Sequence, residues 1–187
     1  MKIVQAPDQV LSQKAKPVNK IDKDITSLLS AMEVALDGAS DPEGVGLAAP
    51  QVGKSLQIFI VRETPKSPLL TFINPHVEKF FDEEKKLSGA KSASGGKKKN
   101  VQLEGCLSLK DIWGVVTRHH AVELSYQDEK GEKHKEKFAG FLATIIQHEY
   151  DHLNGTLFPK RVLEQNNQLY KSVKNSEGET EFEEMSI

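Results

Sequence analysis

The sequence has almost no cysteine: Cys106 is the only one among its 187 residues. A single thiol cannot form an intramolecular disulfide, which excludes the disulfide-stapled scaffolds of small secreted proteins. Long apolar runs are missing as well, so neither a secretory signal nor a membrane-spanning helix is expected. We therefore expect a cytoplasmic protein without a membrane partner.

The chain also lacks a large excess of charge of either sign. Its net charge is −2 at pH 7, with 37% hydrophobic and 28% charged residues. These values are ordinary for a globular protein, and they give no reason to expect direct DNA binding. The length suits one domain with one hydrophobic core.

Hydrophobic spacing predicts two helices. The first begins near Asp22 or Asp24 and ends near Gly38, and its apolar residues share one face. The second runs from about Gly140 to residue 154, and Gly155 is expected to close it in a left-handed conformation. Strand-like segments are expected at residues 56–61, 70–73, 115–116 and 121–126 and in a hairpin partner that ends at 138.

Two segments have compositions that do not suit a packed core. Residues 82–100 are rich in lysine, serine, glycine and glutamate, and we expect a flexible low-complexity loop within a domain of residues 1–165. Residues 166–187 form an acidic C-terminal tail, which is expected to be partly disordered. The lysines at 97–99 leave transient ribosome association open, although a solvated charge run is the simpler interpretation.

The second predicted helix carries the pattern H-E-x-x-H between His148 and His152. A four-residue spacing brings both imidazoles onto one helical face, where they can share a metal ion. Glu149 lies beside them, so its carboxylate can accept a proton from water activated by the metal and later return it to a leaving amine. Chance spacing of two histidines is the alternative, and the glutamate between them argues against it.

Catalytic metal sites usually combine three protein ligands with one open position. Cys106 is the best candidate for the third ligand, because a thiolate binds borderline metals strongly and Gly105 permits a close backbone approach. An inert buried cysteine is the alternative for a lone thiol. A zinc peptidase would instead take its third ligand from downstream of the helix, where Glu164 and Glu177 are available.

Two further alternatives belong to other classes. One is a catalytically silent metal-binding relative, and the other is a cysteine nucleophile paired with a histidine. The presence of Glu149 and Gln51 argues against a silent site, because a structural metal needs neither. Loss of activity with a chelator and recovery with metal would exclude the nucleophile.

Phe141, Thr144 and Ile145 precede His148 by seven, four and three residues, so they share its helical face. We expect them to form an apolar pocket wall, with Val45 as a further contributor. The alternative for Phe141 and Ile145 is ordinary core packing.

A glycine-rich segment at residues 44–53 supplies the remaining candidates. Its small residues let backbone approach a ligand closely, which makes Gly46 a candidate for substrate binding. Gln51 adds a side-chain amide donor.

Three segments together resemble the motifs of the peptide deformylase family: G-V-G-L-A-A-P-Q, E-G-C-L-S and Q-H-E-Y-D-H-L-N-G as they stand here. The resemblance extends from Met1 to about Leu163. It implies an α+β fold in which antiparallel strands surround a central metal-binding helix. It also implies a hydrolase that removes the N-formyl group from the N-terminal formylmethionine of newly synthesised polypeptides and releases formate.

The resemblance further implies ferrous iron as the native metal, although zinc, nickel and cobalt suit the same ligands. It assigns the stabilisation of the developing oxyanion to the Gln51 side chain and to the backbone N–H of Leu107. The sequence departs from the family pattern at Trp113, where an arginine that helps to bind the peptide backbone is expected. Trp113 is therefore a candidate substrate-binding residue with an altered preference.

Overall fold

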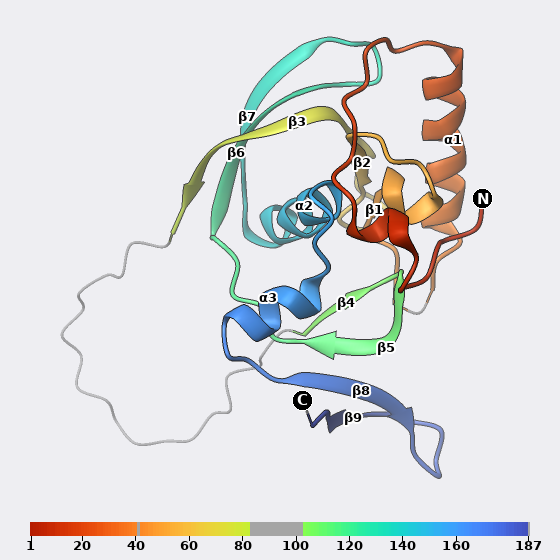
Figure 1. The fold of residues 1–187 in the computed structure, drawn as a ribbon, viewed down its shortest axis with the longest axis vertical. Coiled ribbons are helices and arrows are strands. Elements are labelled where there is room, and N and C mark those ends of the chain that lie inside the picture. Colours follow the sequence, from red (N-terminus) through yellow and green to blue (C-terminus); the bar gives the residue numbers. More distant parts are fainter. Residues whose placement is uncertain (41, 83–102, 187) are drawn as a thin grey trace, which may run out of the picture.

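The computed structural model describes residues 1–40, 42–82 and 103–186. Helix α2 (Gly140–Leu153) lies at the centre, a five-stranded antiparallel sheet curves around it, and a four-stranded antiparallel sheet lies beyond α3 (Phe158–Glu164) (Figure 1). Helix α1 (Lys23–Asp37) covers the outer face of the larger sheet. The expected α+β fold with a central helix is confirmed.

The larger sheet is antiparallel throughout its described pairings. Its strand order is β1 (Gly46–Ala48), β2 (Ile58–Val61), β3 (Leu70–Phe81), β6 (Ala121–Gln127) and β7 (Lys133–Ala139).

Strand β2 is apolar at every position because helices cover both faces of the sheet. Ile58 and Ile60 pack in a cluster with the apolar face of α1. Phe59 and Val61 point the other way and pack with residues of α2. All four side chains are fully buried, as the alternation of side chains along a strand between two helices requires.

The smaller sheet has the order β4 (Glu104–Cys106), β5 (Leu109–Gly114), β8 (Leu169–Lys174) and β9 (Thr180–Glu184). The expectation of a partly disordered tail at 166–187 is wrong for most of that segment, because β8 and β9 form a hairpin there. Strand β8 pairs with β5 in the body of the protein, so its backbone hydrogen bonds are satisfied without a strongly apolar sequence. Helix α3 was also not expected from the sequence.

The predicted ends of the two long helices agree with the structure. The side chain of Asp22 accepts hydrogen bonds from the first turn of α1, as an N-cap residue does. Gly155 follows α2 with a φ of 65°, in the left-handed region. Its position also touches the backbone of Ser12, where an added Cβ would lie 2.6 Å from a carbonyl carbon.

Two strand predictions need correction. The strand expected at residues 70–73 does not end before Asn74-Pro75, because β3 continues to Phe81 with a register shift after Ile73. Asn74 adopts a φ of 51°, and its side chain exchanges hydrogen bonds of 2.7 and 2.8 Å with the backbone of Val18, which holds the irregular strand in place. Residues 115–116 follow β5 and are not part of it. Most of the loop expected at 82–100 lies outside the described residues.

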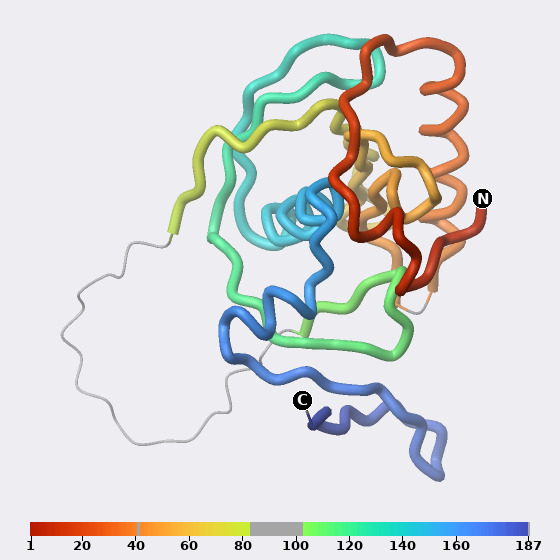
Figure 2. Tube along the Cα trace, viewed as in Figure 1, coloured from red at the N-terminus to blue at the C-terminus, as the bar shows by residue number. Residues whose placement is uncertain are grey.

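The N-terminal segment connects the three motif segments, and Figure 2 shows its path past the end of α2. The N–H of Val4 donates to the carbonyl of Gln51 at 2.8 Å, and that of Ala6 donates to Ser108 at 3.0 Å. Farther along, the N–H of Ala15 donates to the carbonyl of Leu153 at the end of α2, at 2.8 Å. The segment therefore fixes the positions of elements that are distant in sequence.

Within the described ranges, no helix is long and apolar enough to cross a membrane.

Candidate metal centre and substrate cavity

Cys106, His148 and His152 come together between the end of β4 and one face of α2. The Sγ atom and one ring nitrogen from each histidine all lie within 4.8 Å of one another, and Sγ is 3.3 Å from Nε2 of His152. A thiolate and two imidazoles are a ligand set that suits borderline divalent metals. Burial lowers the pKa of His152 well below its usual value, so its ring is neutral, which is the form that binds a metal.

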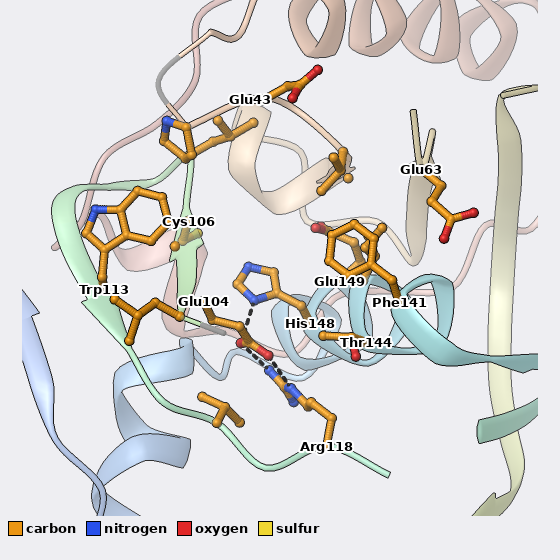
Figure 3. A pocket seen from close by; sticks show the side chains of 18 of the residues that line it. Glu43, Glu63, Glu104, Cys106, Trp113, Arg118, Phe141, Thr144, His148 and Glu149 are labelled. Carbon is orange, nitrogen blue, oxygen red and sulfur yellow. Dashed lines mark hydrogen bonds and ion pairs between the residues drawn. The ribbon is translucent and has the colours of Figure 1, made fainter. Parts of the chain in front are cut away.

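Glu104 fixes the orientation of the His148 ring. Its Oε2 atom lies 3.2 Å from Nδ1 of His148, which leaves Nε2 for the metal side (Figure 3). Burial alone would raise the pKa of Glu104, but hydrogen bonds from His148 and Arg118 outweigh it and lower that pKa to about 2. The carboxylate is therefore ionised at any physiological pH.

Arg118, which also lines the cavity, links Glu104 to a second buried carboxylate. Its Nε and Nη2 atoms donate to both oxygens of Glu104 at 2.8 and 2.9 Å, and Nη1 donates to Asp151 at 2.7 Å. Arg161 of α3 donates to the same Asp151 at 2.6 and 3.1 Å. The charges alternate in sign, so Glu104 and Asp151 each have a cationic partner.

Glu149 is buried beside the three candidate ligands, and its Oε2 atom has no hydrogen-bond partner among the described residues. Burial raises the pKa of Glu149 to about 7. An added Cβ at Gly46 would lie 2.5 Å from Oε1 of Glu149 and 2.8 Å from Ile145. Glycine is therefore required at position 46 for this carboxylate to stay in place.

The Gln51 amide has a fixed orientation. Its Oε1 atom accepts a hydrogen bond from the N–H of Ala48 at 2.8 Å, which leaves Nε2 to point at the candidate metal ligands. Nε2 lies 3.5 Å from Sγ of Cys106. Leu107, the residue after this cysteine, also lines the cavity, and its carbonyl accepts a hydrogen bond from the Gln5 side chain at 3.0 Å.

A cavity of about 440 Å³ opens over these groups. All six residues expected to contact substrate line it: Val45, Gly46, Trp113, Phe141, Thr144 and Ile145. The alternative of core packing also holds for Ile145, which is 4% exposed, but not for Phe141, which is 41% exposed at the rim.

The sequence reasoning missed several lining residues, of which the charged ones are Glu43, Glu63, Glu104 and Arg118. Glu104 carried a signal, since it opens the segment that contains Cys106. Arg118 carried none, because a lone arginine after a strand has no local pattern. The carboxylates considered for a peptidase do not reach the site: Glu164 pairs with Arg161 at 3.0 Å, and Glu177 lies in the exposed β8–β9 turn.

Comparison with known proteins identifies the family. The sequence model of polypeptide deformylase matches residues 1–168. This chain belongs to the peptide deformylase family. The peptide deformylase of Chlorobium luteolum is 40% identical over 160 residues, which cover 83% of this chain and 74% of that protein. That of a Synechocystis species is 39% identical over 158 residues, covering 83% and 75% of the two chains.

Solved peptide deformylase structures have the same fold. The enzyme from Synechococcus elongatus in complex with actinonin superposes with a TM-score of 0.72 at 36% identity, covering 88% of this chain and 81% of that one. The enzyme from Legionella pneumophila gives a TM-score of 0.70 at 32% identity, covering 86% and 84%. The family is metal-dependent, and the Cys106, His148 and His152 group can hold the ion in this chain. Strand β9 lies beyond the matched residues.

Proposed function

We propose that this protein is a metal-dependent amidase that removes the N-formyl group from the N-terminal formylmethionine of newly synthesised polypeptides and releases formate. The observation that carries the proposal is the convergence of Cys106, His148 and His152 with the unpartnered carboxylate of Glu149 beneath one cavity. A structural metal site needs neither the cavity nor the carboxylate.

Cys106, His148 and His152 would hold the metal, with Fe²⁺ as the proposed native ion and Zn²⁺, Ni²⁺ or Co²⁺ able to use the same ligands. A divalent cation held there would polarise the formyl carbonyl and lower the pKa of water. Glu104 holds the His148 ring in the tautomer that presents Nε2.

Glu149 carries the proton during the reaction. Its Oε2 atom is free of hydrogen bonds within the described structure, so it can take the proton from the attacking water. Burial raises the affinity of this carboxylate for a proton, as its raised pKa reports. The same atom then donates the proton to the departing α-amino group, which leaves a free N-terminus and formate.

Negative charge develops on the formyl oxygen as water attacks, and preorganised donors stabilise it. The Gln51 Nε2 group is one donor, because Ala48 already binds the other end of this amide. The backbone N–H of Leu107 is the second proposed donor, and this residue lines the same cavity.

The substrate side chain is held by apolar walls. Val45, which directly precedes β1, lines one part of the cavity. Phe141, Thr144 and Ile145 of α2 line another. An unbranched thioether fits such a wall well, which suits formylmethionine. The proposal places the enzyme in the cytoplasm with nascent chains. Transient association with the ribosome stays a prediction, because the lysines at 97–99 lie outside the described residues.

The test is formate release from the peptide formyl-Met-Ala-Ser by protein purified without oxygen and loaded with Fe²⁺. We expect rapid release that is lost with a chelator and recovered with metal, and that is lost in Glu149→Ala. Absence of release from metal-replete protein would overturn the proposal. Replacement of Cys106 by alanine separates it from a peptidase, because only a deformylase-type site would lose its metal.

A further inference from the structure

Trp113 lies where the smaller sheet meets the substrate cavity. In β5 it pairs with Gly105 of β4 on one side and with Tyr170 of β8 on the other. An added Cβ at Gly105 would lie 2.8 to 3.0 Å from three atoms of the Trp113 ring. The indole therefore packs flat over the residue before Cys106, and it forms part of the cavity lining.

Phe182 of β9 contacts the same indole from the C-terminal hairpin. The two ring centroids are 5.6 Å apart with an interplanar angle of 78°, an edge-to-face arrangement that is favourable for aromatic pairs. Phe182 is 45% exposed, and the remaining four residues of β9 are also exposed. Phe182 belongs to none of the buried core clusters, and its described aromatic contact is with Trp113.

Trp113 is part of the cavity lining, and Phe182, which is not, contacts its ring. Figure 3 shows Trp113 and Phe141 on opposite sides of His148, so the two aromatic rings flank the candidate metal centre. Both aromatic residues line the cavity, so a peptide with its formyl end at the metal ligands would lie within reach of them. The lining also includes Glu43 and Glu63, which would repel an acidic side chain at the mouth.

We propose that the Trp113–Phe182 pair determines the preference of this enzyme for the residues that follow formylmethionine. Trp113 is the specificity-determining residue, and it favours an aromatic or aliphatic side chain over an acidic one. Phe182 is a positioning residue that holds the Trp113 ring against Gly105. This inference rests on the proposed deformylase activity and adds a role for a hairpin strand that lies beyond the matched part of the family.

Kinetics on a short peptide series test the preference. The Fe²⁺-loaded enzyme is assayed on formyl-Met-Ala-Ser and on variants with Phe or Asp at the second or third residue. At one of these positions we expect kcat/KM for the Phe peptide to exceed that for the Asp peptide about tenfold or more. Partial burial of one aromatic side chain against Trp113 strengthens binding by about that factor. Trp113→Ala and Phe182→Ala should shrink this ratio, mainly through KM for the Phe peptide. Phe182→Tyr keeps an aromatic ring and should retain the wild-type ratio.

Fluorescence provides a readout that does not depend on activity. Trp113 is the only tryptophan, so the intrinsic emission of the protein reports this ring alone. We expect Phe182→Ala to shift the emission to the red and to increase quenching by iodide, and the product peptide Met-Ala-Phe to change the wild-type emission. Glu183→Ala, on the opposite face of β9, is the matched control and should retain both the emission and the preference.

The outcomes separate the two proposals. If no formyl peptide is hydrolysed, the deformylase proposal fails. If formyl-Met-Ala-Ser is hydrolysed but Phe and Asp peptides agree within about twofold at both positions, the preference inferred from Trp113 is wrong. A preference that survives Phe182→Ala together with an unchanged emission spectrum would overturn the positioning role of Phe182.

Discussion

The carboxylate of Glu104 lies 3.2 Å from Nδ1 of His148, although 44 residues separate them in the chain. Both side chains are nearly buried, and the hydrogen bond sets which nitrogen of the ring faces the candidate metal. Loss of this contact should therefore weaken metal binding without removing a ligand. For Glu104→Gln we predict a decrease in metal affinity of about 10-fold to 100-fold, measured by competition with a chelator. Unchanged affinity would show that the ring is held by packing alone.

Removal of the proton carrier should affect catalysis and not metal binding. For Glu149→Gln we predict a decrease in kcat/KM of about a hundredfold to ten-thousandfold with full metal content, because general acid–base catalysis contributes in that range. Metal analysis and formate release measure the two effects on the same sample. Glu177→Gln in the exposed β8–β9 turn is the control and should retain activity. Activity in the Glu149 variant close to that of the wild type would exclude Glu149 as the base.

The space around Gly46 leads to a second catalytic prediction. An added methyl group would lie 2.5 Å from Oε1 of Glu149, so Gly46→Ala must displace that carboxylate. We expect a loss of about a hundredfold in kcat/KM with little change in circular dichroism, since a misplacement of about 1 Å can cost this much. Gly38→Ala is the control, because its added Cβ would meet only ordinary contacts at 3.4 Å or more. Equal activity of the two variants would contradict the prediction.

The buried charge network around Arg118 should contribute to stability. Arg118→Ala removes the shared partner of Glu104 and Asp151, whose side chains are 12% and 9% exposed. We predict a decrease in the free energy of unfolding of about 3 kcal/mol, measured by urea denaturation, because loss of one partner of a buried ion pair is costly. Asp151 still pairs with Arg161 in this variant, and Glu104 keeps its contact with His148.

A matched surface arginine provides the comparison. Arg62 pairs with Glu33 and Asp37, whose side chains are 41% and 51% exposed. Arg62→Ala should therefore cost no more than about 1 kcal/mol, because solvent screens these pairs. Equal losses of unfolding free energy in the two variants would show that the Arg118 network stabilises the fold no more than a surface ion pair does.

The β6–β7 turn provides a pH-dependent pair far from the metal ligands. His134 Nε2 lies 2.9 Å from Asp128, and Nδ1 lies 3.6 Å from Glu136, while the ring stacks on Tyr126. The hydrogen bond with Asp128 is the main reason why the pKa of His134 is raised above 6.5, and the same bond lowers the pKa of Asp128 below 3.8.

The sign of each shift fixes the pH window. Protonated His134 stabilises the folded state through this pair. That stabilisation is fully present below pH 6.5 and is lost as the pH rises through the raised pKa of His134. Ionised Asp128 likewise stabilises the folded state. That stabilisation is fully present above pH 3.8 and is lost as the pH falls through the lowered pKa of Asp128. We expect an NMR titration midpoint for His134 above 6.5, and a lower midpoint in Asp128→Asn. A wild-type midpoint at or below 6.5 would disprove the pairing in solution.

The sequence determined the features that depend on short-range spacing. The 3.6-residue period placed His148 and His152 on one face of α2, and local capping residues fixed both ends of α1 and the C-terminal end of α2. The same spacing puts Phe141 and Ile145 on the face of α2 that lines the cavity. Three short motifs were enough to identify the family, because identity and order are properties of the sequence alone.

Only the tertiary structure decided which distant residues support the site. Nothing local marks Arg118 as the partner of Glu104 and Asp151, and the β9 segment is exposed and acidic without an alternating pattern. Strand β9 forms because β8, already paired with β5, offers its free backbone groups. The pairing of β8 with β5 joins segments that are distant in the chain, which no local pattern of residues records. The contact of Phe182 with Trp113 belongs to this second class.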